Sequence, residues 1–176
     1  DWNAAGNILA DAARALEKGG AECVVICANT MHKCADAVCA AVAIPLIHIA
    51  DATAAAIKKS PSKKPLLLGT RYTMEHDFYR GRLRDRHGIA VVVPDAATRE
   101  TVHRIIYEEL CRGEIRADSK RAFADIVRRH SAAGADGVIF GCTEIGMLIA
   151  ESDFNPPCFD TTKLHAAAAL HFALAD

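Results

Sequence analysis

The chain has 176 residues, of which 51% are hydrophobic and 24% are charged, and its formal net charge is −1. This composition is that of a globular protein with a buried core, and it excludes a disordered or collagen-like chain. The 21 basic and 22 acidic residues are mixed along the sequence. We therefore expect no face for nucleic acid or for an anionic membrane, and no apolar stretch is long enough to predict a membrane-spanning helix.

Helical and strand-like patterns alternate along the chain. In chain order, we expect a helix over 8–18, a strand over 23–27, a helix over 31–41, a strand over 44–49, a helix over 52–59, a strand over 66–68, a helix over 74–86, a strand over 89–93, helices over 97–112 and 119–133, a strand over 138–140, a short helix to 150, a strand ending at 159 and a closing helix to 174. Asn29-Thr30 is expected to cap the second helix, and Thr161 or Thr162 the last. This alternation predicts an α/β fold with parallel sheets.

The chain also repeats itself weakly. Residues 20–27 and 134–142 share a Gly-Ala-acid start, an apolar strand and a cysteine at its end. The repeat predicts two related, pseudo-symmetric α/β domains facing each other, the first formed by 1–51 plus 162–176 and the second by 52–161. The second half opens with the strand over 66–68, which has no counterpart before residue 8. We therefore expect the first domain to lack its N-terminal strand and loop, about 50 residues by the size of a typical βαβ unit.

Seven cysteines, an odd number, do not form the pattern of a small secreted disulfide scaffold. Three of them, Cys23, Cys27 and Cys142, lie in apolar strand-like runs. We expect free thiols and a reducing compartment. Because the chain shows no signal-peptide pattern, we expect a cytoplasmic location.

Cys27 and Cys142 each lie where a predicted parallel strand ends and a helix begins. Ligands bind in the crevice at this edge of open α/β sheets. The partial positive charge of a helix N-terminus is expected to lower the pKa of each thiol and favour the thiolate. Two such thiols facing each other suit a reaction in which one base removes a proton from a carbon and the other delivers a proton to the opposite face.

Other chemistries have weaker support in the sequence. Cys23 and Cys27 are four strand residues apart, roughly 13 Å, which is too far for two ligands of one zinc ion. No Cys-x-x-Cys pair indicates a thiol redox protein, and no glycine-rich phosphate loop indicates a nucleotide site. His32 and His48 are interpreted as polar or half-buried neighbours of the site. For His165 we weigh packing against a role in orienting Cys142.

Several segments carry a family resemblance. The segments are Cys27-Ala28-Asn29-Thr30-Met31-His32, Gly141-Cys142-Thr143-Glu144-Ile145, Leu68-Gly69-Thr70-Arg71-Tyr72-Thr73-Met74, Ile106-Tyr107-Glu108-Glu109-Leu110 and Asp160-Thr161-Thr162. Together they resemble the signatures of the aspartate/glutamate racemase superfamily, and most of all its aspartate racemase branch, which includes broad-specificity amino-acid racemases. The resemblance implies racemisation without pyridoxal phosphate, in a site between two pseudo-symmetric domains.

The resemblance also implies roles for individual residues. Cys27 and Cys142 would be the two bases. Asn29 and Thr30, with Thr143 from the other half, would hold the α-carboxylate of the substrate. Thr70 and Thr73 would line the site, and Glu144 would contact the ammonium group or orient Cys142.

The resemblance carries further expectations. We expect an amino acid as the small-molecule substrate, no cofactor, no metal and a homodimer. A glycine-rich first loop and an arginine that some members use for the side-chain carboxylate of the substrate have no match in this sequence, so the identity of the substrate stays open. The alternatives are another cysteine-based isomerase, such as a maleate isomerase or hydantoin racemase, and an inactive ligand-binding fragment.

Overall fold

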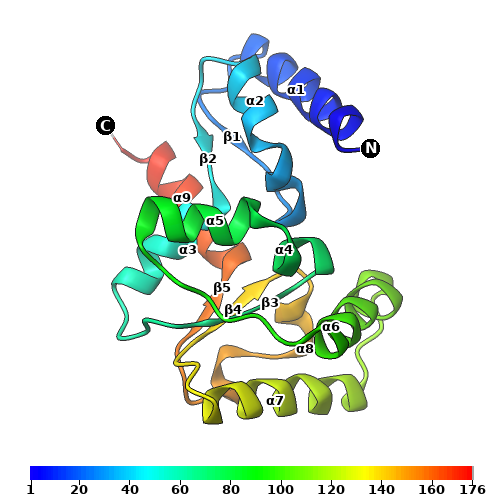
Figure 1. Cartoon of the computed structure of the whole chain (residues 1–176). Helices are drawn as coiled ribbons and strands as arrows, with labels where there is room; N and C mark the ends of the chain where they lie inside the picture. Colours follow the sequence, from blue (N-terminus) through cyan, green and yellow to red (C-terminus); the bar gives the residue numbers. More distant parts are fainter. Residues whose placement is uncertain (176) are drawn as a thin grey trace.

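The computed structural model describes residues 1–175, whose helices and strands alternate along the chain (Figure 1). The strands are β1 (Val24–Val25), β2 (Leu46–Ile47), β3 (Leu66–Gly69), β4 (Val138–Gly141) and β5 (Cys158–Asp160). The α-helices are α1 (Trp2–Lys18), α2 (Ala35–Ala41), α3 (Ile49–Lys58), α4 (Arg71–Glu75), α5 (Asp77–His87), α6 (Ala96–Glu108), α7 (Ala117–Ala132), α8 (Ile145–Leu148) and α9 (Thr161–Ala173), and the 3-10 segments are η1 (Thr30–Cys34), η2 (Leu110–Arg112) and η3 (Glu151–Asp153).

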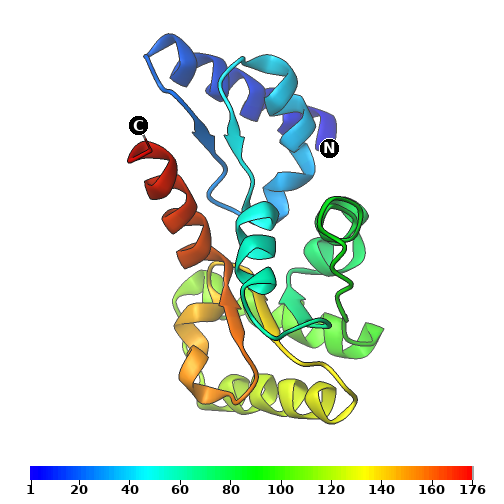
Figure 2. The same cartoon turned by 90° about the vertical axis from the view of Figure 1, so that its left-hand side faces the viewer.

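The strands form two separate parallel sheets, as the alternation predicts. β1 pairs with β2, and β3, β4 and β5 form the second sheet in that order. α1 and α2 lie with the first sheet, while α6, α7 and α8 lie with the second (Figure 1). The last helix, α9, starts at the end of β5 and runs back alongside the first sheet (Figure 2). The α/β fold with parallel sheets is therefore confirmed.

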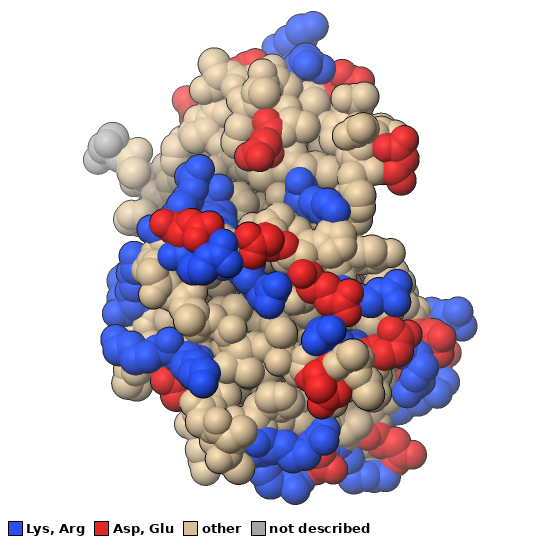
Figure 3. Space-filling model, in the orientation of Figure 1, with Lys and Arg blue, Asp and Glu red and all other residues tan. Residues whose placement is uncertain are grey.

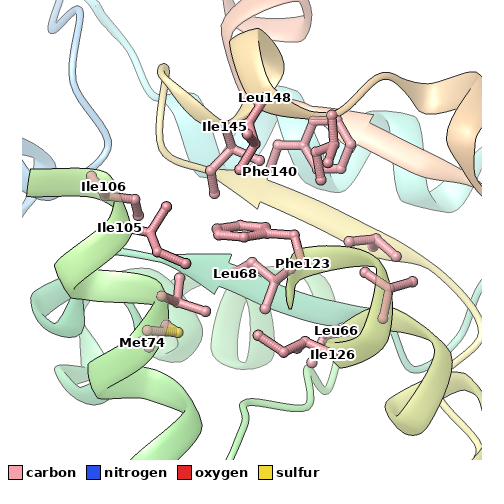
Figure 4. Packing of buried hydrophobic residues seen from close by; sticks show 14 of the residues in the cluster. Leu66, Leu68, Met74, Ile105, Ile106, Phe123, Ile126, Phe140, Ile145 and Leu148 are labelled. Atoms are coloured by element: carbon pink, nitrogen blue, oxygen red, sulfur yellow. The ribbon is translucent and has the colours of Figure 1, made fainter. Parts of the chain in front are cut away.

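The main core lies on both faces of β3 and β4. Leu66 and Leu68 face a cluster that includes Phe123 and Phe140, whereas Leu67 faces the cluster on the other side of the sheet with Tyr79. Figure 4 shows the first of these clusters between the sheet and the helices α6 and α7. Because both faces are covered, the strand sequence is continuously apolar, which is typical of a parallel strand.

Two glycines let β3 and β4 approach closely where these strands end. Gly69 and Gly141 are partners in the register of the sheet. A Cβ added at Gly69 would lie 2.7 Å from the carbonyl oxygen of Gly141, and one added at Gly141 would lie 2.8 Å from that of Leu68. Real Cβ atoms do not approach backbone this closely, so glycine is required at the edge where Thr70 and Cys142 follow.

Some expected elements differ in the structure. The predicted strand over 89–93 is wrong, because only a single bridge joins Val92 to Leu66 before Pro94. Proline has no backbone N–H to donate to a neighbouring strand, and it restricts the backbone conformation of the residue before it. The predicted helix over 74–86 is divided at His76, whose backbone is extended (φ −78°, ψ 152°). Each half of the divided segment is a helix of its own, α4 and α5.

The predicted capping residues also need correction. The side chain of Asp160, rather than that of Thr161 or Thr162, accepts the backbone N–H groups that open α9. Asn29 precedes η1 but makes no side-chain capping bond. In both cases the side chain of the expected cap is used in a long-range contact instead, because Asn29 and Thr161 bond to each other.

Acidic and basic side chains are interspersed on the face shown in Figure 3, and the part formed by the first sheet with α1 and α2 carries few of them. Among residues 1–175, no helix combines the length and the apolar character needed to cross a membrane.

Candidate active site

The loop that follows β1 carries Cys27. The N–H of Ala28 donates to the carbonyl of Ile26 at 2.8 Å, so Cys27 is the central residue of a three-residue turn. Its side chain is exposed, and it borders an apolar hollow whose other walls include Leu9, Leu16 and Met31. The chain then enters η1 at Thr30. The turn therefore presents the thiol at the carboxyl end of the first sheet.

The same loop reaches the carboxyl end of β3. The hydroxyl of Thr30 lies 2.8 Å from that of Thr70 and 3.3 Å from that of Thr73, and Thr70 and Thr73 are 3.2 Å apart. Thr70 also caps α4 by accepting the N–H of Thr73. Three hydroxyl groups from two halves of the chain therefore converge, as expected if they belong to one site.

The loop also reaches the ends of β4 and β5 through Asn29. The Asn29 Nδ2 group donates to Thr161 Oγ1 at 2.9 Å, and Thr161 in turn donates to the carbonyl of Phe140 at 2.7 Å. Since the Thr161 proton goes to a carbonyl, Asn29 must be the donor, and this fixes the orientation of its amide. The Asn29 Oδ1 atom is buried and has no hydrogen-bond partner among the described residues. A buried acceptor without a partner is costly, which suits a group that receives a donor from a ligand.

The second cysteine lies directly after β4, two residues beyond Phe140. The Cys142 Sγ atom donates to Glu144 Oε2 at 2.8 Å, and the Thr143 hydroxyl donates to the same oxygen at 2.7 Å. Burial would raise the pKa of Glu144, but these two hydrogen bonds outweigh it and hold the pKa below its usual value. Glu144 is therefore an ionised acceptor that orients the thiol.

The expectation that a helix N-terminus lowers the pKa of Cys142 is wrong. Burial raises the pKa of this thiol well above its usual range, and the hydrogen bond and negative charge of Glu144 raise it further. The following helix, α8, has only four residues, so its dipole is small beside these two effects. Both effects therefore favour the protonated thiol form of Cys142.

The structure brings most of the predicted site residues together. The loop carrying Cys27, Asn29 and Thr30 contacts the segments that follow β3 and β5, and Thr161 links it to Phe140 within β4. Cys142, Thr143 and Glu144 form a second cluster directly after β4. Glu144 is placed to orient Cys142, one of its two expected roles. His165 does not contact Cys142, because its Nε2 bonds to the carbonyl of Ile47 at 2.6 Å.

Thr161 is a member of this arrangement that was not among the predicted site residues. Thr161 is fully buried and joins Asn29 to β4. The available signal was its position directly after a parallel strand, which is the rule that found the two cysteines. Within residues 1–175, no group of three His, Cys, Asp or Glu side chains is arranged to hold a metal ion.

These features define a two-part α/β protein whose polar loops meet at the carboxyl ends of parallel strands. The model of the family described as Asp/Glu/Hydantoin racemase matches residues 1–169, and the chain belongs to that family. The resemblance seen in the sequence is therefore confirmed.

Individual relatives agree with this assignment. A candidate Asp/Glu racemase from Yersinia pestis has a crystal structure similar to this chain, with 52% identity and a TM-score of 0.93 over 99% of this chain and 76% of that one. PH1733 from Pyrococcus horikoshii, described as an aspartate racemase homologue, gives 37% identity and a TM-score of 0.88 with the same coverage. The broad specificity amino-acid racemase RacX of Bacillus subtilis is 24% identical over 95% of this chain and 71% of its own length.

Proposed function

We propose that this protein is a cofactor-independent amino-acid racemase in which Cys27 and Cys142 exchange the α-proton of the substrate. The observation that carries the proposal is the pair of contacts made by the Cys27 loop. Thr30 meets the hydroxyls that follow β3, and Asn29 is joined through Thr161 to β4, just before Cys142. One loop thus links the segments that bear the two thiols. We further propose that the substrate is aspartate, glutamate or one of several other amino acids, by analogy with relatives described as an aspartate racemase homologue and a broad specificity amino-acid racemase.

The protonation state of Cys142 suggests how the reaction starts. Because burial and the contact with Glu144 favour the thiol form of Cys142, Cys142 delivers a proton to the α-carbon while the Cys27 thiolate takes one from the opposite face. This transfer leaves Cys142 as the thiolate and Cys27 as the thiol. The other enantiomer reacts with the roles exchanged: the Cys142 thiolate takes the α-proton, and the Cys27 thiol delivers one to the opposite face. The converging threonine hydroxyls would stabilise the carboxylate next to the carbanion-like centre.

The test is α-proton exchange in deuterium oxide, followed for both enantiomers of aspartate, glutamate and several neutral amino acids with the complete natural protein. The proposal predicts incorporation of deuterium at the α-carbon together with inversion, without added pyridoxal phosphate. Turnover of maleate or of a hydantoin, with no exchange in any amino acid, would replace this function by one of the alternatives. Binding of amino acids without exchange would identify a ligand-binding relic.

A further inference from the structure

Next to the candidate active site lies a buried cluster of three histidines that the reaction does not use directly. His32 belongs to η1, His48 precedes α3 and His165 belongs to α9. The ring centroids of His32 and His48 are 4.4 Å apart, and those of His32 and His165 are 5.5 Å apart. Each is less than 5% exposed. The cluster therefore lies in the interior, where each ring nitrogen needs a defined partner.

The hydrogen bonds of His32 fix its tautomer. Its Nδ1 lies 2.9 Å from the carbonyl oxygen of Ala28, and a carbonyl only accepts, so Nδ1 carries the proton. Its Nε2 accepts the backbone N–H of Ile49 at 3.1 Å. Both ring nitrogens are thus used, one as a donor and one as an acceptor, and only the neutral ring can do both. Burial lowers the pKa of His32 to about 4, in agreement with a neutral ring.

The Ala28 carbonyl belongs to the turn that carries Cys27, so a hydrogen bond to it acts on the backbone beside the thiol. Ala28 lies between Cys27 and Asn29, and its N–H already closes the turn around Cys27. His32 therefore binds the carbonyl group of the same residue and connects it to Ile49, the first residue of α3. Asn29 and Thr30 have anchors of their own in Thr161, Thr70 and Thr73. Among the described residues no hydrogen bond holds the Cys27 side chain, so the position of this thiol depends on the backbone of its turn.

We propose that His32 is a positioning residue for the Cys27 thiol, acting as a neutral ring that clamps the carbonyl of Ala28 to the start of α3. This inference rests on the proposed racemase function. His32 does not touch the substrate, and its effect passes through the backbone of the turn. A displacement of about 1 Å of a reacting group can lower a rate by about 100-fold, so loss of the clamp should act on kcat more than on KM.

Two variants separate the two hydrogen bonds of His32. His32→Leu removes both, whereas His32→Asn keeps a donor that can reach the Ala28 carbonyl four residues earlier and loses the acceptor for Ile49. His48→Asn is the matched control. His48 is a buried histidine of the same cluster whose Nδ1 caps α3 by accepting the N–H of Ala50, and asparagine preserves such a cap.

In His32→Leu, kcat should fall by about 100-fold, with a smaller change in KM. In His32→Asn, kcat should lie between the values of His32→Leu and the wild type. In His48→Asn, kcat should change by less than threefold. A kcat of His32→Leu within threefold of the wild type, or an equal loss in His48→Asn, would overturn the positioning role. If His32→Leu does not fold, His32→Asn and the wild-type measurement below decide the question.

Two readouts do not depend on turnover. Nitrogen-15 NMR of the histidine rings in the wild-type protein should show His32 as the neutral Nδ1–H tautomer at pH 7, and the Nε2–H tautomer would contradict the clamp. Amide hydrogen exchange at Ile49 should be at least tenfold faster in both His32 variants than in His48→Asn. If the wild type exchanges no α-proton, the proposed function fails. These two measurements then show separately whether His32 holds the loop.

Discussion

The same histidines make the stability of the protein sensitive to mild acid. Burial lowers the pKa of His32 to about 4 and that of His48 to about 3. The unfolded chain, in which the histidine pKa is about 6.5, therefore binds more protons than the folded chain below that pH. The free energy of unfolding must fall as the pH falls below 6.5, and the loss continues until the pH reaches the folded values.

The magnitude follows from these two pKa values. Between pH 7 and pH 5, each ring lowers the free energy of unfolding by about 1.9 kcal/mol, and the two together lower it by at most about 3.8 kcal/mol. The groups that face the pair are His165 from α9, Arg82 from α5 and Asp51 from α3. Burial opposes ionisation of Asp51, but hydrogen bonds from Arg82 and His87 hold its pKa at about 2. Asp51 therefore stays ionised between pH 7 and pH 5 and does not contribute to the pH dependence of the free energy of unfolding.

The assay is urea unfolding at pH 7 and at pH 5. The comparison is between the wild type and the double variant His32→Asn/His48→Asn, because the difference between their pH dependences isolates the two rings. His171→Gln serves as a control, since His171 is exposed on α9. The two histidines are not the source of the acid sensitivity if the double variant has the same pH dependence as the wild type, or if the wild type loses less than about 1 kcal/mol.

Three further perturbations test the packing and the second cysteine. Gly141→Ala should destabilise the protein by about 1–3 kcal/mol in urea unfolding, because its Cβ would meet the Leu68 carbonyl at 2.8 Å; an unchanged midpoint would contradict the close approach of the strands. Phe123→Ala should cost about 3–5 kcal/mol, since this ring is fully buried in the main core, and a loss below 1 kcal/mol would show that the core packs differently. Glu144→Gln should lower the pKa of Cys142, seen as faster alkylation of that residue at pH 8, and slower alkylation would contradict the role given to the carboxylate.

The sequence predicted the parts of the fold that depend on local patterns. The apolar run Leu66–Leu68 predicted a buried parallel strand because both of its faces had to be covered, and the structure covers them with different clusters. The positions of Cys27 and Cys142 after strands followed from the same reasoning. The apolar run over 89–93 carried a similar pattern, but local sequence does not show that only Val92 would find a partner.

Parts of the site could not be predicted because they depend on distant contacts. The two partners of His32 are backbone groups of Ala28 and Ile49, and no side-chain pattern marks them. The raised pKa of Cys142 likewise depends on its burial and on the rotamer of Glu144. The general rule for a thiol at the start of a helix takes no account of this burial or of this rotamer. It therefore predicted a lowered pKa for Cys142, whereas the pKa is raised.

We propose that two thiols share the proton transfer, and α-proton exchange in cysteine variants is the decisive experiment. Deuterium incorporation and inversion should be measured for Cys27→Ser and Cys142→Ser, with Cys39→Ser as the control, because Cys39 is an exposed thiol on α2. Serine is too weak an acid to act as a base near neutral pH, so each site variant should lose racemisation by at least about 100-fold, while Cys39→Ser retains it. Full racemase activity in Cys142→Ser would contradict the two-thiol account.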